Sequence, residues 1–241
     1  MDKLTEIIIY TTAAGACIPL GGFLAWIERI RPDWLEREFR HFIIAFGGGV
    51  LIAAVALVLI PEGLVQIYGS PVGVGYVMAG GLVFFYMERS LGYRRRETPQ
   101  FSAMLLDYIP ESLALGGMFS VNATAAPLLA LLIGLQNLPE GFNAYRELKT
   151  VEGIRPGRVL AQMCLLIPLG PILGVTGWLF LANHGHFLGA IMLFAAGGIL
   201  YLLFQDIAPQ SRMRRHWGPP LGAVCGFSLA LMGKILVNHT W

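Results

Sequence analysis

Two short polar clusters interrupt otherwise apolar stretches near the middle of the chain. The first contains Asp107 and Glu111, and the second contains Gln136, Asn137 and Glu140. Residues four positions apart lie on the same face of a helix, so each cluster presents two oxygen-bearing side chains in one direction. Carboxylate and amide oxygens gathered in this way are suitable ligands for a divalent cation.

A proline stands directly before the glutamate of each cluster, at Pro110 and Pro139. Proline inside a helix removes a backbone hydrogen bond and frees the carbonyl four residues earlier, which adds a backbone oxygen to each cluster. A charged side chain at the centre of a membrane span costs at least about 2.5–3.5 kcal/mol, and such residues mostly face a cavity, a partner or an ion. We therefore expect both clusters to serve a function.

The composition is typical of an integral membrane protein. Hydrophobic residues make up 56% of the chain and charged residues 13%, whereas soluble domains contain about 25% charged residues. The net charge of +2 is too small to indicate nucleic-acid binding. The three cysteines lie in apolar runs without CxxC spacing, so we interpret them as small core residues.

Apolar segments and their connections occupy all of residues 1–241, so we expect one all-α transmembrane domain and no separate soluble domain. Each segment is long enough to cross the bilayer as a helix. The eight expected spans are 7–27, 42–64, 72–91, 101–121, 127–145, 158–181, 187–208 and 219–237.

The basic residues predict the orientation of these spans. All but two of the seventeen Lys and Arg residues fall in the connections after the first, third, fifth and seventh spans, the exceptions being Lys3 and Lys234. By the positive-inside rule those connections are cytoplasmic, which places both termini outside. The acidic start of the chain and the absence of a cleavage motif argue against a removable signal peptide.

The two Pro-Glu motifs, LDYIPESLALG and GLQNLPEGF, in a chain of this organisation resemble the ZIP family of divalent metal transporters, especially its bacterial branch. LVLIPEGL and FAAGGILYLLFQDIAPQS are similar to that family's patterns too, so the resemblance covers the whole chain. It implies a ZIP-like bundle in the plasma (inner) membrane that carries zinc, manganese or iron into the cytoplasm as its substrate, without an organic cofactor. Similar proteins often form homodimers.

The same resemblance implies a metal site between the fourth and fifth spans. Its expected ligands are Asp107, Glu111, Gln136, Asn137 and Glu140. Asp107 stands where the family usually has histidine, Tyr108 where it usually has asparagine, and Ile167 about where a glutamate is common. The family's second metal position therefore stays open. An all-oxygen ligand set favours harder cations, so we expect manganese or iron to be carried comparably to zinc.

The sequence also bears on two other classes of function. A non-transporting metal sensor or assembly protein could keep the fold and lose part of the site, which the departures at Tyr108 and Ile167 allow. An intramembrane enzyme is disfavoured, because the sequence has no HExxH motif, no GxSxG elbow and no histidine at the centre of a span. We therefore expect a transporter and not an enzyme.

Acidic residues also occur near the ends of two other spans. Glu62 is predicted either to lie at the interface or to act as an entrance ligand, and these two readings stay open. Gln205 and Asp206 are predicted to form a solvated cap at the inner end of the seventh span.

Overall fold

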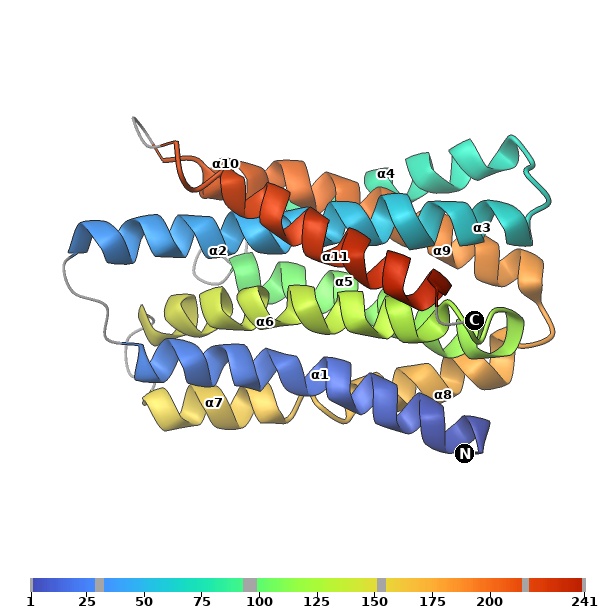
Figure 1. Cartoon of the computed structure of the whole chain (residues 1–241), viewed down its shortest axis with the longest axis horizontal. Coiled ribbons are helices and arrows are strands. Elements are labelled where there is room, and N and C mark those ends of the chain that lie inside the picture. The colour runs from blue at the N-terminus through green and yellow to red at the C-terminus, as the bar shows by residue number, and fades with distance from the viewer. Residues whose placement is uncertain (1, 29–32, 93–98, 151–154, 214–216, 240–241) are drawn as a thin grey trace.

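The computed structural model of the chain describes residues 2–28, 33–92, 99–150, 155–213 and 217–239. These residues are helical apart from short turns, and no strand occurs among them. They form eight helical segments that run along one common axis (Figure 1). The expectation of an all-α fold is confirmed.

Helices occur at each of the eight expected positions. Four segments are single helices: α1 (Lys3–Ile27), α4 (Val72–Gly92), α5 (Pro99–Val121) and α6 (Ala126–Thr150). The second segment joins α2 (Asp33–Ala54), the π-helical turn η1 (Val55–Leu59) and α3 (Ile60–Gln66). The remaining segments are α7 (Pro156–Cys164) with α8 (Leu169–Leu181), α9 (Gly185–Leu202) with η2 (Leu203–Ile207) and α10 (Ala208–Ser211), and α11 (Leu221–His239).

The helices differ from several of the expected bounds, most of all at the start of α2, and one expected span is interrupted. Helix α2 begins at Asp33, nine residues earlier than expected, because charged residues such as Glu, Arg and Lys are good helix formers when they lie outside the bilayer. The sixth segment is interrupted by turns between Cys164 and Leu169. Pro168 explains this break, since it has no N–H and disfavours the helical conformation of the residue before it.

The apolar character of the helices indicates a membrane protein. Within the part of the chain that the structure describes, four helical segments could cross a bilayer by length and hydropathy: Lys3–Ile27, Arg37–Gln66, Pro156–Leu181 and Gly185–Ser211. A shorter apolar helix covers Leu221–Val237. The polar clusters reduce the apolar character of α5 and α6, which lie beside these segments in the bundle.

Glycines allow neighbouring helices to pack with their backbones in direct contact. A Cβ atom at Gly21 of α1 would collide with the Leu138 carbonyl of α6, and one at Gly141 of α6 would collide with the Ile18 carbonyl of α1. The same kind of contact joins α5 to α8, α4 to α9, and α2 to α11. Small residues at such crossings are characteristic of helix packing within membranes, where dispersion forces act only at close range.

Two of the long segments contain a π-helical turn followed by a proline. The turn η1 ends two residues before Pro61, and η2 ends two residues before Pro209. Because the chain runs in opposite directions in these segments, η1 lies toward one end of the bundle and η2 toward the other (Figure 1). π-helical turns are rare and often occur at functional sites.

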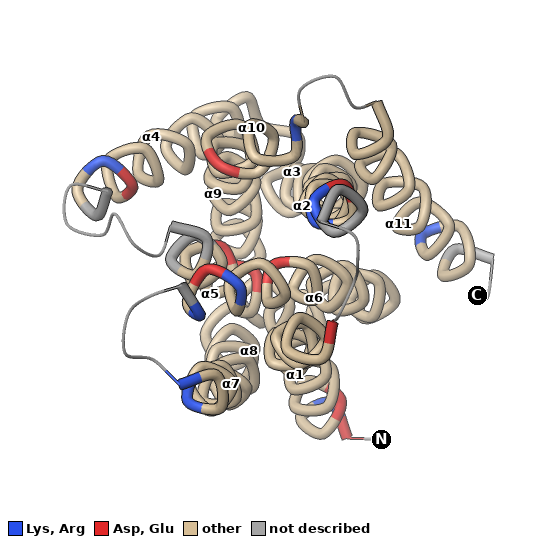
Figure 2. Tube along the Cα trace, turned by 90° about the vertical axis from the view of Figure 1, so that its left-hand side faces the viewer, with Lys and Arg blue, Asp and Glu red and all other residues tan. Residues whose placement is uncertain are grey.

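The two ends of the bundle differ in charge. The beginning of α1 and the end of α11 lie at the same end, and we call this the terminal end (Figure 1). The opposite end, which faces the viewer in Figure 2, carries most of the described basic residues: Arg37, Arg40, Arg89, Arg146, Lys149, Arg155, Arg158 and Arg212. Arg29, Arg31, Arg94, Arg95, Arg96, Arg214 and Arg215, which also support the predicted orientation, lie outside the described residues.

Candidate metal centre

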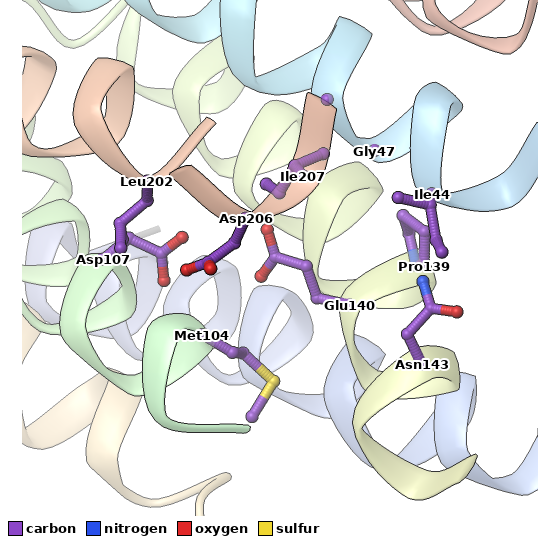
Figure 3. A pocket seen from close by; sticks show the side chains of 11 residues that line it. Ile44, Gly47, Met104, Asp107, Pro139, Glu140, Asn143, Leu202, Asp206 and Ile207 are labelled. Carbon is purple, nitrogen blue, oxygen red and sulfur yellow. The ribbon is translucent and has the colours of Figure 1, made fainter. Parts of the chain in front are cut away.

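Carboxylates from three helical segments line one narrow cavity inside the bundle, which we call the carboxylate cavity. Asp107 comes from α5, Glu140 from α6 and Asp206 from η2, and their side chains point toward one another in Figure 3. The cavity has a volume of about 40 Å³. Since one water requires about 10–15 Å³ on this measure, the space holds a few waters or one largely dehydrated cation.

The remaining walls of the cavity come mostly from apolar side chains and from two glycines of α2. Gly47 lies against the Pro139 ring, and Gly48 lies against the side chain of Ile207. The lining residues besides the three carboxylates are Ile44, Gly47, Gly48, Met104, Pro139, Asn143, Leu202 and Ile207. The carboxylate oxygens therefore face a small space whose other walls are apolar apart from the Asn143 amide.

Several of these oxygens have no protein hydrogen-bond partner among the described residues. They are Asp107 Oδ1, both carboxylate oxygens of Glu140, Asn143 Oδ1 and Asp206 Oδ2, and all of them are buried. Asp107 as a whole is 4% exposed. Buried charged groups are normally paired, because removal from water carries a large desolvation penalty. The cavity thus gathers carboxylate oxygens that these residues leave without a compensating partner.

Glu111 and Gln136 form a second part of the arrangement, directly between α5 and α6. The Gln136 amide nitrogen donates a hydrogen bond of 2.6 Å to Glu111 Oε2, and both side chains are 0% exposed. Glu111 Oε1 and Gln136 Oε1 are buried without a partner among the described residues. The expected pairing of the two polar clusters across these helices is therefore present, with two oxygens still available.

Asn137 points in a different direction from Gln136. Its amide nitrogen donates a hydrogen bond of 2.9 Å to the Ala14 carbonyl of α1. The side chain is 1% exposed and does not line the carboxylate cavity. This contact makes Asn137 a link between α6 and α1, and its role as a metal ligand stays a prediction.

Asp206 is the functional candidate that the sequence reasoning missed. The expected solvated cap is wrong for Asp206, which is half-buried and points into the carboxylate cavity beside Glu140 (Figure 3), whereas Gln205 is exposed. The π-helical turn η2 contains Asp206 and sets its direction. A signal was present in the sequence, since the acidic residue falls within a long apolar segment and precedes Pro209 by three positions.

Tyr108 occupies the space on the other side of α5. Its ring is 1% exposed, and its hydroxyl lies where a Cβ atom at Gly15 of α1 or Gly170 of α8 would stand. The Ile167 carbonyl also lies next to Gly15. Tyr108 and Ile167, two of the three positions that differ from the pattern of the resembled family, are thus close together, and a packed phenol ring fills this part of the bundle.

The described residues do not form a compact metal-binding group of the usual kind. No three His, Cys, Asp or Glu side chains among them lie close enough to hold one ion. Asp107, Glu140 and Asp206 share a cavity at larger separations, and the structure brings Glu111 together with Gln136. The convergence of Asp107, Glu111, Gln136 and Glu140 on a single ion stays a prediction.

Comparison with known proteins supplies no further assignment. No protein-family description matches the chain, and no curated protein is similar to it in sequence.

Proposed function

We propose that this protein carries divalent transition-metal cations across a membrane, with zinc, manganese and iron as its substrates. The observation that supports this most strongly is the carboxylate cavity, where buried oxygens of Asp107, Glu140 and Asp206 have no protein partner among the described residues. A divalent cation is the ligand that best compensates such a concentration of negative charge.

The proposed binding path includes the Glu111–Gln136 pair as well as the cavity. A cation held by Asp107 and Glu140 would need further oxygens, and Glu111 Oε1 and Gln136 Oε1 supply them on the neighbouring turns of α5 and α6. Small movements of side chains would bring these oxygens to coordination distance. The site would then contain oxygen ligands only, which suits manganese and ferrous iron as well as zinc.

The proposed topology follows the distribution of basic residues. Eight spans cross the plasma or inner membrane, the arginine-rich end faces the cytoplasm, and the terminal end faces outward. Cations enter the cytoplasm by this route. The positions of α1 and α11 at one end of the bundle support the topology.

Uptake into proteoliposomes tests the proposal. The parent protein should accumulate Mn²⁺ or Zn²⁺, and Glu140→Ala should abolish this accumulation because it removes the carboxylate whose two oxygens are both buried in the cavity without a partner among the described residues. Glu6→Ala is a matched control, since Glu6 lies in the first turn of α1, outside the cavity. The absence of uptake of any divalent cation by the parent, with metal bound at Glu140, would favour a non-transporting sensor instead.

A further inference from the structure

Lys234 of α11 places a positive charge inside the bundle near the terminal end. Its ammonium group donates a hydrogen bond of 2.7 Å to the Leu57 carbonyl of η1, and the side chain is half-buried. The other two lysines of the chain, Lys3 and Lys149, are exposed. A lysine within an apolar helix is costly, so its partner and surroundings bear on its role.

The Leu57 carbonyl is available because of the proline that follows the π-helical turn. Pro61 stands four residues after Leu57 and has no N–H, so the helix cannot supply the usual donor to this oxygen. The ammonium of Lys234 takes the place of that donor. Lysine has three N–H groups, and only one is used in this contact.

The ammonium also lines a second polar cavity, which we call the terminal cavity. Its volume is about 270 Å³, and its polar lining consists of Glu62, Asn122, Thr124 and Lys234. Asn122 donates a hydrogen bond of 3.0 Å to one Glu62 carboxylate oxygen. The cavity thus holds one fixed positive and one fixed negative charge, together with amide, hydroxyl and backbone oxygens.

The terminal cavity and the carboxylate cavity lie along the same helical segment. Gly47 lines the carboxylate cavity and Leu57 lines the terminal cavity, and ten residues of this segment span about 15 Å. Between them, the buried side chains of Leu51 and Val55 belong to the apolar core. A cation that approaches from the terminal end would therefore meet Lys234 before it reaches the apolar layer.

We propose that Lys234 is a tethered cation that occupies the Leu57 carbonyl of the terminal cavity until a divalent ion displaces it, so that this residue determines which cations enter. The inference rests on the proposed transport function. A monovalent ion has the same charge as the ammonium and gains nothing by exchange. A divalent ion interacts about twice as strongly with Glu62 at equal distance, because the Coulomb energy is proportional to charge.

Chemical labelling of the lysines tests the displacement directly. The purified parent protein is treated with an amine-acetylating reagent, with and without MnCl₂, and acetylation of Lys3, Lys149 and Lys234 is followed by mass spectrometry. Without Mn²⁺, Lys234 should be acetylated more slowly than Lys3. Addition of Mn²⁺ should make the acetylation of Lys234 several-fold faster, whereas KCl at equal ionic strength should have no effect on it. Lys3 is exposed at the same end of the bundle and serves as the internal control.

Variants separate displacement from a purely structural role of the lysine. In Glu62→Gln the Mn²⁺-dependent increase at Lys234 should disappear, because the oxygen that attracts the ion has lost its charge. In Lys234→Gln, Mn²⁺ uptake should fall several-fold when KCl replaces N-methyl-D-glucamine chloride, since potassium can now occupy the cavity. Lys234→Arg keeps the charge and should remain insensitive to potassium.

The outcomes distinguish this inference from the proposed function. If the parent transports Mn²⁺ and Lys234 reacts at the same rate with and without the ion, the tethered-cation role is refuted and transport stands. If Mn²⁺ accelerates acetylation of Lys234 but no divalent cation is transported, the displacement stands and the transport function fails. If neither effect is seen, both are refuted.

Discussion

Replacement of Glu140 by glutamine should change stability in opposite directions with and without metal. Both Glu140 oxygens are buried without a protein partner among the described residues, and they face the carboxylates of Asp107 and Asp206. Glutamine has nearly the same shape and removes the charge. In the presence of a chelator, Glu140→Gln should therefore stabilise the protein by about 1–3 kcal/mol, the range expected when a poorly compensated buried charge is removed.

With metal present, the parent should be more stable than Glu140→Gln. A ligand at one hundred times its dissociation constant stabilises the folded state by about 2.7 kcal/mol. If the loss of one carboxylate weakens Mn²⁺ binding about a hundredfold, the same concentration stabilises the variant by only about 0.4 kcal/mol. Mn²⁺ should thus favour the parent over the variant by about 2.3 kcal/mol, the difference between about 2.7 and about 0.4 kcal/mol. This exceeds the middle of the range expected for the charge penalty, so the parent becomes the more stable protein.

Thermal unfolding in detergent, recorded in chelator and in MnCl₂, measures both effects. Glu6→Gln provides the control, because Glu6 lies in the first turn of α1 and outside the cavity. Two results would refute the reasoning: a variant that is less stable than the parent in chelator, or one that responds to Mn²⁺ as strongly as the parent does. Either result would mean that Glu140 is compensated by something other than a metal ion.

Three further predictions concern selectivity, protons and packing. Asp107→His should shift the preference in competition uptake from manganese toward zinc, because imidazole suits zinc better than carboxylate does; an unchanged ratio would contradict the all-oxygen site. Uptake should decrease as the pH is lowered from about 7.5 to about 5.5, since protons compete with the cation for the carboxylates. A pH-independent apparent affinity would contradict this competition. Gly141→Ala should destabilise the protein by about 1–3 kcal/mol in thermal unfolding, because its Cβ collides with the Ile18 carbonyl, whereas Gly75→Ala meets no atom within 4 Å and should have little effect.

The helical segments could be predicted from the sequence because membrane helices are defined by local composition. Runs of apolar residues predicted helices at all eight positions, and the termini of α1 and α11 lie at one end as an even number of segments requires. The interruption before Leu169 was missed, although Pro168 was visible. Proline within an apolar run can kink a helix or end it, and the sequence does not say which.

The direction of the site residues was harder to predict than their positions. Helical spacing placed Gln136 and Glu140 on one face, and the structure directs Gln136 to Glu111 and Glu140 to the carboxylate cavity. Asn137, one position along the helix, turns toward α1 instead and bonds the Ala14 carbonyl. Spacing within one helix defines its faces, but it does not identify the neighbouring helix that each face meets.

Asp206 was missed for a related reason. A standard helical register and a position near the end of an apolar run favoured a solvated cap. The π-helical turn η2 widens the helix at this point, and the half-buried carboxylate lines the carboxylate cavity. Hydrophobic patterns assume a constant number of residues per turn, so a local change of register escapes them.

The two π-helical turns give their segments room for a change of length that a regular helix lacks. A π-helical turn contains about one residue more than an α-helical turn, so it absorbs an extra residue locally. Deletion of one residue within Val55–Leu59 should therefore restore regular helix and leave Glu62 facing the terminal cavity. The same deletion in α6, which has no such turn, would rotate all the following side chains by about 100° relative to the preceding ones.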